Sequence, residues 1–473
     1  MTPCKQETNP QKFIKMKTTL LTLICASLVA SGKEPPNIVL IMADDLGWFD
    51  AHFQGNEALD TPHLDKFVTE GMLFPHGYAA APVCTPTRAA MLTGMSPARL
   101  SITNHAPGHK EGMVPEGRKQ AGAKKLTYLP LEATTLAERL KDEAGYATGF
   151  VGKWHLSHRK GSDEAGKKFE PGLRPEFQGF DLNIGGYDRG GPPTYFAPYK
   201  IPTLKEGKDG EYLPDRLADE CIQFIKEQKK GPFFLTFWNY SVHYPIEAPE
   251  DLIEKYKKRP VENAPYAAMI EGMDRSIGKV LKSLDDLGLS ENTIVIFTSD
   301  NGSLFSNGPL RANKGHLYEG GMRVPWSIRW PGKIKPGSSN DTPVISTDVF
   351  PTLLAVAGLK PKEGTPLDGE SLIPILTGSG TLQRESLFFH YPNYAFHNRN
   401  RLGGAIRKGD YKLIHFYDDD SVELYDVVVD QGEKNNLAPS KPKLAREMRV
   451  ELGHWLKESG AKMPYVVDTK SKE

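Results

Sequence analysis

Oxygen-bearing side chains directly follow two apolar runs that lie far apart in the sequence. They are Asp44 and Asp45 after the first run, and Asp300 and Asn301 after the second. Each run is continuous and rich in β-branched residues, which is typical of a buried parallel strand. Because the carboxyl ends of parallel strands meet at one edge of a sheet, we expect the four side chains to lie together. Hard oxygen ligands suit calcium or magnesium, whereas the cluster lacks the thiolate and imidazole spacing that zinc prefers.

Basic side chains that could hold an oxyanion occur at four further places, namely Arg88, Lys153, His243 and Lys314. Transfer at a tetrahedral sulfur or phosphorus centre depends on positioning and on neutralising the equatorial oxygens, so a metal with such cations is a suitable set of groups. His155 stands two residues after Lys153, beyond another predicted strand. Each residue alone also has a structural explanation, since a single lysine is usually a solvated surface charge and a lone histidine usually a packing residue.

The first 32 residues have the pattern of a signal peptide. Lys12, Lys15 and Lys17 precede an apolar run at residues 20–30, and small residues follow it. The run is too short to span a bilayer comfortably, so we expect no transmembrane anchor. The alternative is an N-terminal core helix. We predict a signal peptide at residues 1–32, with Met16 as an alternative start, and an exported protein located in the periplasm or outside the cell.

Removal of the signal peptide leaves two of the four cysteines, Cys84 and Cys221. Cys221 shares one face of a predicted helix with Leu217, Phe224 and Ile225, where it is expected to be a buried apolar side chain. Cys84 instead lies in a proline-flanked polar stretch and is expected to be an exposed odd thiol. Such a thiol in an exported protein calls for a functional explanation.

The elements that must position these residues alternate between strand and helix. Strands are predicted at residues 37–43, 148–151, 233–239 and 293–299, and amphipathic helices at residues 132–144 and 265–287. The alternation predicts an α/β fold with a large, mostly parallel central sheet flanked by helices. Ligands of such sheets gather at the carboxyl ends of the strands, where the acidic residues, Lys153, His155 and His243 are expected.

The pattern changes beyond about residue 380. Short strands are predicted at residues 386–390, 404–407, 412–416 and 423–426, followed by a helix at residues 441–458. We therefore expect a catalytic domain at residues 33–380 and a smaller C-terminal subdomain, an antiparallel sheet plus a helix, at residues 381–473. The tract rich in Gly and Pro at residues 158–214 is expected to form a wall of the substrate pocket.

The balance of charge excludes some partners. The chain has 59 basic and 59 acidic residues, so its formal net charge is zero. It has no global field that would favour nucleic acid or an anionic membrane surface. We therefore expect no nucleic-acid partner.

A resemblance to a known family is found at residues 81–94. The segment Ala-Pro-Val-Cys-Thr-Pro-Thr-Arg-Ala-Ala-Met-Leu-Thr-Gly resembles the signature of the type I, formylglycine-dependent sulfatases of the alkaline phosphatase-like superfamily. Companion motifs occur in the family's order and cover nearly the whole mature chain: residues 36–39 with 44–48, 152–156, 243–245, 299–302 and 319–325. The pattern Cys-x-Pro-x-Arg alone is short enough to recur by chance, but the joint match is specific. Within the family, the resemblance points to bacterial secreted carbohydrate sulfatases.

The resemblance implies a chemical fate for Cys84. In this family a maturation enzyme oxidises the motif cysteine to formylglycine, and the hydrated aldehyde provides the attacking hydroxyl. Cys84 would be the precursor of the nucleophile, and a formylglycine-generating enzyme would be a partner of the chain.

The resemblance also implies roles for the other matching residues. One calcium ion would be held by Asp44, Asp45, Asp300, Asn301 and the modified Cys84. The sulfate would be held by Lys153, His243 and Lys314, and the hydrated aldehyde oriented by Arg88 and His155.

These inferences predict hydrolysis of sulfate esters on a sulfated polysaccharide or oligosaccharide. Two alternatives remain open. A formylglycine-type phosphodiesterase or phosphonate hydrolase would share the metal, the nucleophile and the fold. A non-catalytic binder of sulfated glycans would keep the fold without maturation. Four intact residues argue against it, namely Cys84, His155, His243 and Asp300.

Loop residues near the catalytic motifs are candidates for contacts with the sugar. They are His105, His109, His158, Tyr187, Asp188, Arg189 and His316. Most loop residues of this kind serve only the local structure. Tyr187 and Arg189 are favoured, because an aromatic face suits stacking on a sugar and a guanidinium suits a carboxylate or sulfate.

Overall fold

The computed structural model of the chain describes residues 35–158 and 171–467, and the main feature of this part is an eight-stranded sheet. The strand order is β5-β4-β6-β1-β7-β8-β2-β9. The bounds are β1 Asn37–Ala43, β2 Met72–Leu73, β4 Ala147–Gly152, β5 Leu182–Ile184, β6 Phe233–Trp238, β7 Thr293–Ser299, β8 Trp326–Arg329 and β9 Ser338–Ser339. In this order, the neighbouring strands β5, β4, β6, β1 and β7 are parallel, whereas β8 pairs antiparallel with β7 and with β2. The predicted α/β fold with a mostly parallel sheet is confirmed.

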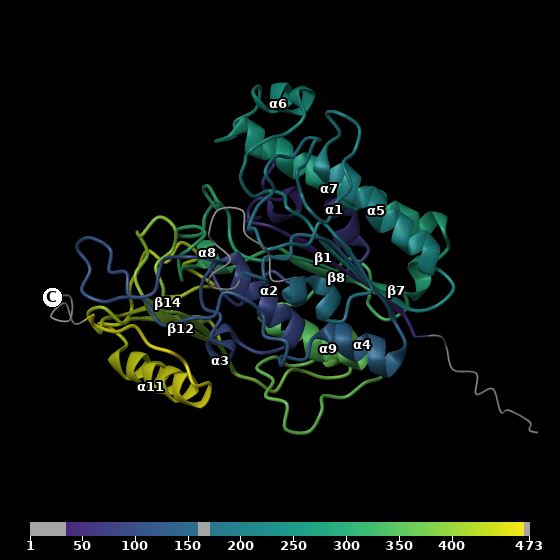
Figure 1. Cartoon of the computed structure of the whole chain (residues 1–473). Helices are drawn as coiled ribbons and strands as arrows, with labels where there is room; N and C mark the ends of the chain where they lie inside the picture. Colours follow the sequence, from purple (N-terminus) through teal and green to yellow (C-terminus); the bar gives the residue numbers. More distant parts are fainter. Residues whose placement is uncertain (1–34, 159–170, 468–473) are drawn as a thin grey trace, which may run out of the picture. The chain divides into compact units, whose positions relative to one another are not determined.

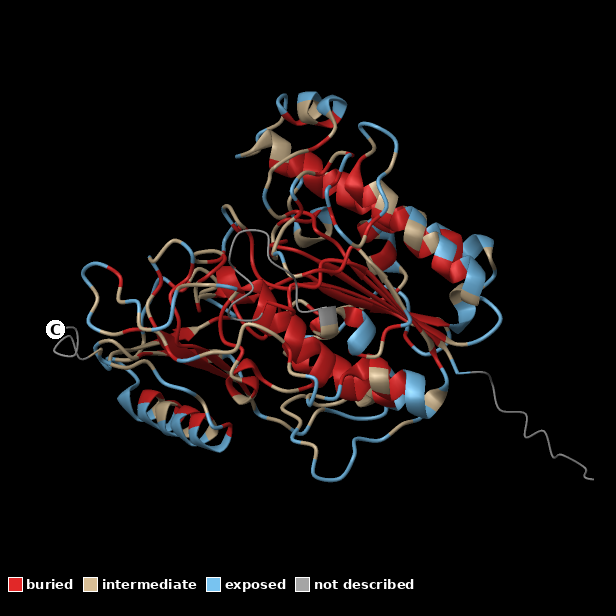
Figure 2. Cartoon of the chain, viewed as in Figure 1, coloured by how far each residue is buried: buried red, intermediate tan, exposed pale blue. Residues whose placement is uncertain are grey.

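Helices cover both faces of this sheet (Figure 1). The main ones are α2 Cys84–Thr93, α4 Leu136–Ala144, α5 Leu213–Gln228, α7 Ala264–Asp286 and α9 Val349–Val356. Side chains alternate along β1, so Val39 and Ile41 pack in the cluster of α5 and α7, while Ile38 and Leu40 pack in the cluster of α2, α4 and α9. Every residue of β1 and β7 is buried (Figure 2). The polar residues that follow these two strands are therefore held by the core.

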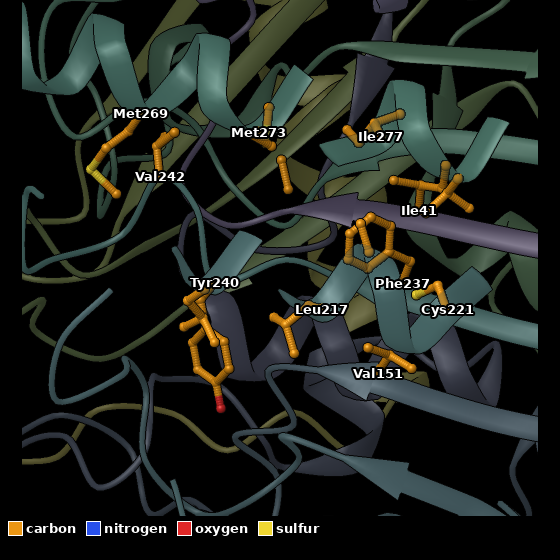
Figure 3. Packing of buried hydrophobic residues seen from close by; sticks show 14 of the residues in the cluster. Ile41, Val151, Leu217, Cys221, Phe237, Tyr240, Val242, Met269, Met273 and Ile277 are labelled. Carbon is orange, nitrogen blue, oxygen red and sulfur yellow. The ribbon is translucent and has the colours of Figure 1, made fainter. Parts of the chain in front are cut away.

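Cys221 belongs to the core on the α5 side, as predicted. It is fully buried and lies in the same cluster as Ile41, Leu217 and Phe237 (Figure 3). Burial of apolar surface stabilises the fold by about 25 cal/mol per Å². This packing fixes β1 and β6 against α5, and so fixes the strand ends.

A second, four-stranded sheet is formed near the C-terminus, in the order β11-β12-β13-β14 (Figure 1). Its strands are β11 Ser386–Tyr391, β12 Gly403–Lys408, β13 Tyr411–Phe416 and β14 Val422–Asp426, and the helix α11 spans Pro442–Glu458. All neighbouring strands are antiparallel. Leu413 and Leu424 of the sheet pack against Met448 and Leu452 of α11. The predicted antiparallel sheet with a helix is confirmed, and the domain boundary near residue 380 stays a prediction.

Shorter elements complete the described part. They are α1 Pro62–Thr69, α3 Pro97–Leu100, α6 Glu250–Tyr256, α8 Glu319–Met322 and α10 Ile373–Leu376; the paired strands β3 Gly77–Tyr78 and β10 Val344–Ile345; and the 3-10 helices His52–Gln54, Pro171–Leu173, Pro175–Phe177, Ser290–Asn292 and Ser346–Asp348. In the described ranges, no helix combines the length and the apolar character needed to cross a membrane. The predicted signal peptide lies outside the described residues.

Two elements differ from the expectation. The helix predicted from residue 132 begins at Leu136, because the Thr135 side chain and Glu138 form a capping box at that point. The tract at residues 158–214, where no strand was predicted, contains the edge strand β5, which pairs with β4. β5 is half-buried and only three residues long, so it carries no clear hydrophobic period.

Candidate active site

The acidic side chains predicted to bind a metal meet at the carboxyl ends of β1 and β7. Ala43 is the register partner of Ser299, so the residues that follow the two strands are neighbours. Asp44, Asp45 and Asp300 each offer an oxygen within 4.8 Å of the others. All three are fully buried. Three buried carboxylates this close repel one another unless cations neutralise them.

Protein cations neutralise part of this charge. Lys153 Nζ lies 2.6 Å from Asp44 Oδ2, and Lys314 Nζ lies 2.5 Å from Asp45 Oδ1. Although burial alone would raise it, Lys314 and other nearby cations hold the pKa of Asp45 well below its usual value. Burial together with the neighbouring carboxylates raises the pKa of Asp44, despite Lys153.

Three oxygens of the cluster nevertheless have no hydrogen-bond partner. They are Asp44 Oδ1, Asp45 Oδ2 and Asn301 Oδ1. Asn301 Nδ2 donates to Asp45 Oδ1 at 2.8 Å, which leaves its carbonyl oxygen available for a cation. Buried oxygens without a donor are costly, and a hard cation such as calcium would satisfy all three. The residues present therefore fit a metal ion of this kind.

Arg88 joins the acidic cluster to the end of β4. Its Nε donates to Asp300 Oδ2 at 2.9 Å, its Nη2 forms an ion pair with the same oxygen at 2.7 Å, and its Nη1 donates to the carbonyl of Lys153 at 2.6 Å. Burial alone would lower the pKa of Arg88, but Asp300 and Asp44 raise it above its ordinary value. The guanidinium thus stays charged and fixes both strand ends.

Cys84 is the first residue of α2 and is 1% exposed, so the prediction of an exposed thiol is wrong. The helix begins at Cys84 itself, and every residue of the helix is buried. Burial raises the pKa of the thiol in spite of Lys153 and Lys314. An unmodified Cys84 is therefore protonated at neutral pH and a weak nucleophile.

His155 faces Cys84 with one defined nitrogen. Its Nε2 lies 2.6 Å from the carbonyl oxygen of Ala106, which can only accept, so Nε2 carries the proton. Nδ1 lies 3.3 Å from Cys84 Sγ. Burial and Lys153 hold the pKa of His155 well below its ordinary value, which keeps the ring neutral. The lone pair of Nδ1 thus faces the start of α2, where Cys84 Sγ and Thr85 Oγ1 both lie 3.3 Å away.

Sequence reasoning missed Thr85, which braces this pair. Its Oγ1 donates to the carbonyl of His155 at 3.3 Å and accepts from the amide of Ala106 at 3.0 Å. The signal was present, because Thr85 directly follows Cys84 at the start of α2.

His243 stands at the solvent side of the cluster, with 22% of its side chain exposed. Its Nδ1 donates to the carbonyl of Tyr244 at 2.9 Å, so Nε2 faces inward, 3.8 Å from Asp45 Oδ2. Burial, Lys153 and Lys314 lower the pKa of His243 to about 3. A bound anion would raise this pKa again.

The backbone at the end of β4 requires a glycine. Gly152 has φ 111°, and a Cβ there would lie 1.9 Å from the carbonyl oxygen of Trp238 on the neighbouring strand. His155 follows with φ 57°, in the left-handed region. Close packing against β6 and the turn that follows it aim Lys153 and His155 in different directions.

The predicted sugar-contact residues are distributed around the site. Arg189 is exposed and Asp188 half-buried. Tyr187 is 2% exposed, lies in the core and donates through its hydroxyl to the carbonyl of Gly191 at 3.0 Å, so its ring face is not open to a sugar. Stacking on Tyr187 is therefore not supported, and the other contacts stay predictions.

The histidines of this set have separate surroundings. His109 and His158 line a cavity of about 410 Å³. His316 stacks on His397 at 4.8 Å and donates through Nδ1 to the carbonyl of Asn313 at 3.1 Å, which braces the loop before Lys314. His105 is half-buried, and burial with Lys314 and other neighbouring charges lowers its pKa to about 3.

Comparison with known proteins identifies the family. The Sulfatase family matches residues 36–359, and N-sulphoglucosamine sulphohydrolase, C-terminal, matches residues 312–459. N-acetylgalactosamine-6-sulfatase of Canis lupus familiaris is 34% identical over 434 residues, covering 84% of this chain and 75% of that protein. Arylsulfatase A of Homo sapiens is 34% identical over 479 residues, covering 89% of this chain and 86% of that protein.

A solved structure agrees in fold as well as in sequence. The crystal structure of Ps i-CgsB in complex with k-i-k-neocarrahexaose has a TM-score of 0.75 and 28% sequence identity, covering 89% of this chain and 93% of that chain. The chain belongs to the sulfatase family, as its motifs predicted. It is a sulfuric ester hydrolase.

Proposed function

We propose that this enzyme hydrolyses sulfate esters of carbohydrates with a formylglycine made from Cys84 and a bound calcium ion. The observation that carries the proposal is the group of three unpartnered buried oxygens in the same site as the buried thiol. The charges of Lys153, Lys314, Asp300 and Asp44 all act on that thiol. A buried, protonated cysteine is a poor nucleophile, so its place in the site is explained if it is the precursor of formylglycine.

The hydrated aldehyde of formylglycine supplies a hydroxyl for attack on sulfur and a second hydroxyl through which the aldehyde is regenerated. The charges of Lys153 and Lys314 act on this position, and His243 becomes a further donor once a bound anion raises its pKa. Two ammonium groups and an imidazole can neutralise the three outer oxygens of a sulfate ester as charge develops on them.

The calcium ion would be held by Asp44, Asp45, Asp300, Asn301 and the modified residue 84. It would supply Lewis-acid polarisation of oxygens at that residue and of the sulfate. Support comes from the three unpartnered oxygens and from the cluster of ligand side chains that the described residues form, which consists of carboxylates.

His155 is the base in this proposal. Its protonated Nε2 is engaged by Ala106, so Nδ1 is the atom that takes a proton from residue 84. Arg88 holds Asp300 and the end of β4, and so keeps Lys153 and His155 in position. Lys314 Nζ, or His243 Nε2 once the bound anion has raised its pKa, would protonate the departing sugar oxygen; the His243 side chain is 22% exposed and lies at the open side of the cluster.

A carbohydrate substrate is supported by the relatives. One of the similar proteins is named N-acetylgalactosamine-6-sulfatase. Another, Ps i-CgsB, was crystallised in complex with k-i-k-neocarrahexaose. We propose a sulfated galactose- or galactosamine-type polysaccharide or oligosaccharide. Export through a signal peptide at residues 1–32, and maturation by a formylglycine-generating enzyme, belong to the same proposal.

Parallel assays test the function. The enzyme, expressed with a maturation enzyme, is given an aryl sulfate, the matching aryl phosphate, and position-defined sulfated mono- and oligosaccharides of galactose and N-acetylgalactosamine. We expect turnover of the aryl sulfate, slower turnover of the phosphate, and faster turnover of at least one sulfated saccharide. A preference for the phosphate ester, or no sulfate release from any probe, would reject the proposal.

A further inference from the structure

An exposed phenylalanine stands beside the cationic side of the site. Phe396 is 51% exposed, although the five residues before it, 391–395, are all buried. Its ring centroid lies 6.0 Å from Lys314 Nζ, which in turn lies 2.5 Å from Asp45 Oδ1. A group attached to a sulfate held by Lys314 therefore comes within reach of this ring.

The loop that carries Phe396 joins β11 to β12 and is fixed on both sides of the ring. The amide of Ala395 donates to Asn400 Oδ1 at 2.8 Å. On the other side, His397 Nε2 donates to the carbonyl of Lys314 at 3.3 Å. The backbone thus presents Phe396 to the site in a defined position, and the C-terminal sheet supplies a side chain to the catalytic centre.

His105 adds a polar atom next to the ring. The two rings lie edge to face, with centroids 6.3 Å apart and an interplanar angle of 76°. His105 Nδ1 donates to Asn104 Oδ1 at 3.0 Å, and the ring is neutral because burial and Lys314 lower its pKa to about 3. Nε2 is therefore a hydrogen-bond acceptor.

This pair of groups matches the surface of a sugar ring. A pyranose has an apolar C–H face and hydroxyl donors at its edge, and aromatic side chains pack well against such faces. Single exposed apolar side chains are common and need no function. Phe396 differs from them in its distance to Lys314 and in its partner His105.

We propose that Phe396 determines substrate specificity by stacking against the pyranose that carries the sulfate ester, while His105 accepts a hydrogen bond from a hydroxyl of that sugar. The inference rests on the proposed function and names the contact that selects the sugar. It also transfers to Phe396 the stacking role that buried Tyr187 cannot perform.

The test compares Phe396→Ala and Phe396→Trp with a matched control, Phe177→Ala. Phe177 is also 51% exposed and lies in the 3-10 helix Pro175–Phe177, outside the site. The probes are the sulfated saccharide that the wild-type enzyme hydrolyses fastest and inorganic sulfate as a competitive inhibitor. Melting temperatures check the fold of each variant.

We expect Phe396→Ala to raise KM for the saccharide about tenfold, with Phe396→Trp within about twofold of the wild type. The inhibition constant of inorganic sulfate, which has no sugar, stays the same in all variants, and Phe177→Ala changes nothing. An unchanged KM in Phe396→Ala, or equal losses in Phe396→Ala and Phe396→Trp, would overturn the inference while leaving the proposed function intact. A wild-type enzyme that hydrolyses no sulfate ester would overturn both.

Discussion

At the scale of the residue, the proposed chemistry depends on which nitrogen of His155 carries its proton. The Ala106 carbonyl holds the proton on Nε2, and burial keeps the ring neutral. Nδ1 then faces residue 84 as a base over the whole neutral range. This arrangement needs no carboxylate partner, because a backbone carbonyl fixes the tautomer.

Replacement of this base tests its role. His155→Gln should lower kcat by about 10²- to 10⁴-fold, the usual contribution of a positioned base, with a smaller change in KM. Steady-state kinetics on an aryl sulfate measure the effect. His390→Gln is the control, because His390 is equally buried but lies in the C-terminal sheet, where it contacts Tyr417. If His155→Gln kept the wild-type kcat, His155 would not be the base of the reaction.

Metal removal tests the acidic cluster. Without a cation, three buried carboxylates repel one another, so dialysis against a strong chelator should lower both Tm and activity. Added calcium should restore both, and elemental analysis of the untreated protein should find about one calcium per chain. Full activity and an unchanged Tm in chelated protein would contradict the calcium site.

Residue types were predictable where a motif carried them, but their surroundings were not. The positions of Asp44, Asp45, Asp300 and Asn301 follow from strand ends visible in the sequence. The burial of Cys84 does not, because it depends on residues far along the chain, such as His155 and Tyr391, that come near it only in the folded protein. Phe396 was missed for the same reason, since its neighbour His397 is 83 residues from Lys314 in sequence and contacts it only in the folded protein.

At the scale of the element, the turn after β4 places Lys153 and His155 with the help of a single glycine. The close approach of Gly152 to Trp238 leaves no space for a side chain, and its φ of 111° is unfavourable for any other residue. A substitution there must move β4 away from β6 or rotate the turn. Either change displaces both catalytic candidates.

Gly152→Ala should therefore cost about 3 kcal/mol of stability or more and abolish most activity. Gly145→Ala is the matched control, because Gly145 also has a left-handed φ, 69°, but a Cβ there would meet nothing within 4 Å. That variant should cost only about 1 kcal/mol and keep full activity. Equal losses in the two variants, measured by urea unfolding, would show that the contact with Trp238 is unimportant.

Long, buried elements were well predicted, and short ones were not. β1 and β7 have the predicted bounds because six consecutive apolar or β-branched residues in each leave little ambiguity. β5 was missed because three half-buried residues at a sheet edge have no distinguishing pattern. Its strand character comes from pairing with β4, which the local sequence does not encode.

At the scale of the whole molecule, a buried ion network joins the C-terminal sheet to the loop that contains Lys314. Lys412 of β13 lies 2.9 Å from Glu319 Oε1 and 3.3 Å from Glu433 Oε1, and all three are fully buried. One lysine cannot neutralise two carboxylates. Burial alone would raise the pKa of both carboxyl groups. Lys412 and nearby arginines nevertheless lower the pKa of Glu319 to about 2. Burial and the charge of Glu319 raise the pKa of Glu433 to about 7.

This network predicts a pH dependence of stability. The pKa of Glu433 in the folded protein, about 7, lies above its ordinary value, so the folded state binds the extra proton between about pH 4.5 and 7. The contribution of Glu433 to the free energy of unfolding is fully present below about pH 4.5 and is lost as the pH rises through 7. Glu433→Gln, which does not titrate, should lack this loss, so Tm of the variant relative to the wild type should increase from pH 5 to pH 8 by the equivalent of about 2 kcal/mol. A constant Tm difference across this range would contradict the shifted pKa.

The two-sheet organisation was predictable from the change in pattern beyond residue 380, whereas its link to the active site was not. Lys412, Glu319 and Glu433 are charged residues that sequence patterns assign to the surface. Only the fold brings them together in the core, beside the loop of Lys314.

The most direct test of the central claim is the mass of the peptide that contains residue 84, measured together with turnover. In enzyme expressed with a maturation enzyme, we predict that Cys84 is replaced by the lighter formylglycine, and that turnover of an aryl sulfate rises in proportion to the converted fraction. Cys84→Ser should at best be sulfated once and not turn over. Full turnover by enzyme in which residue 84 remains an unmodified cysteine, or by Cys84→Ser, would contradict the account.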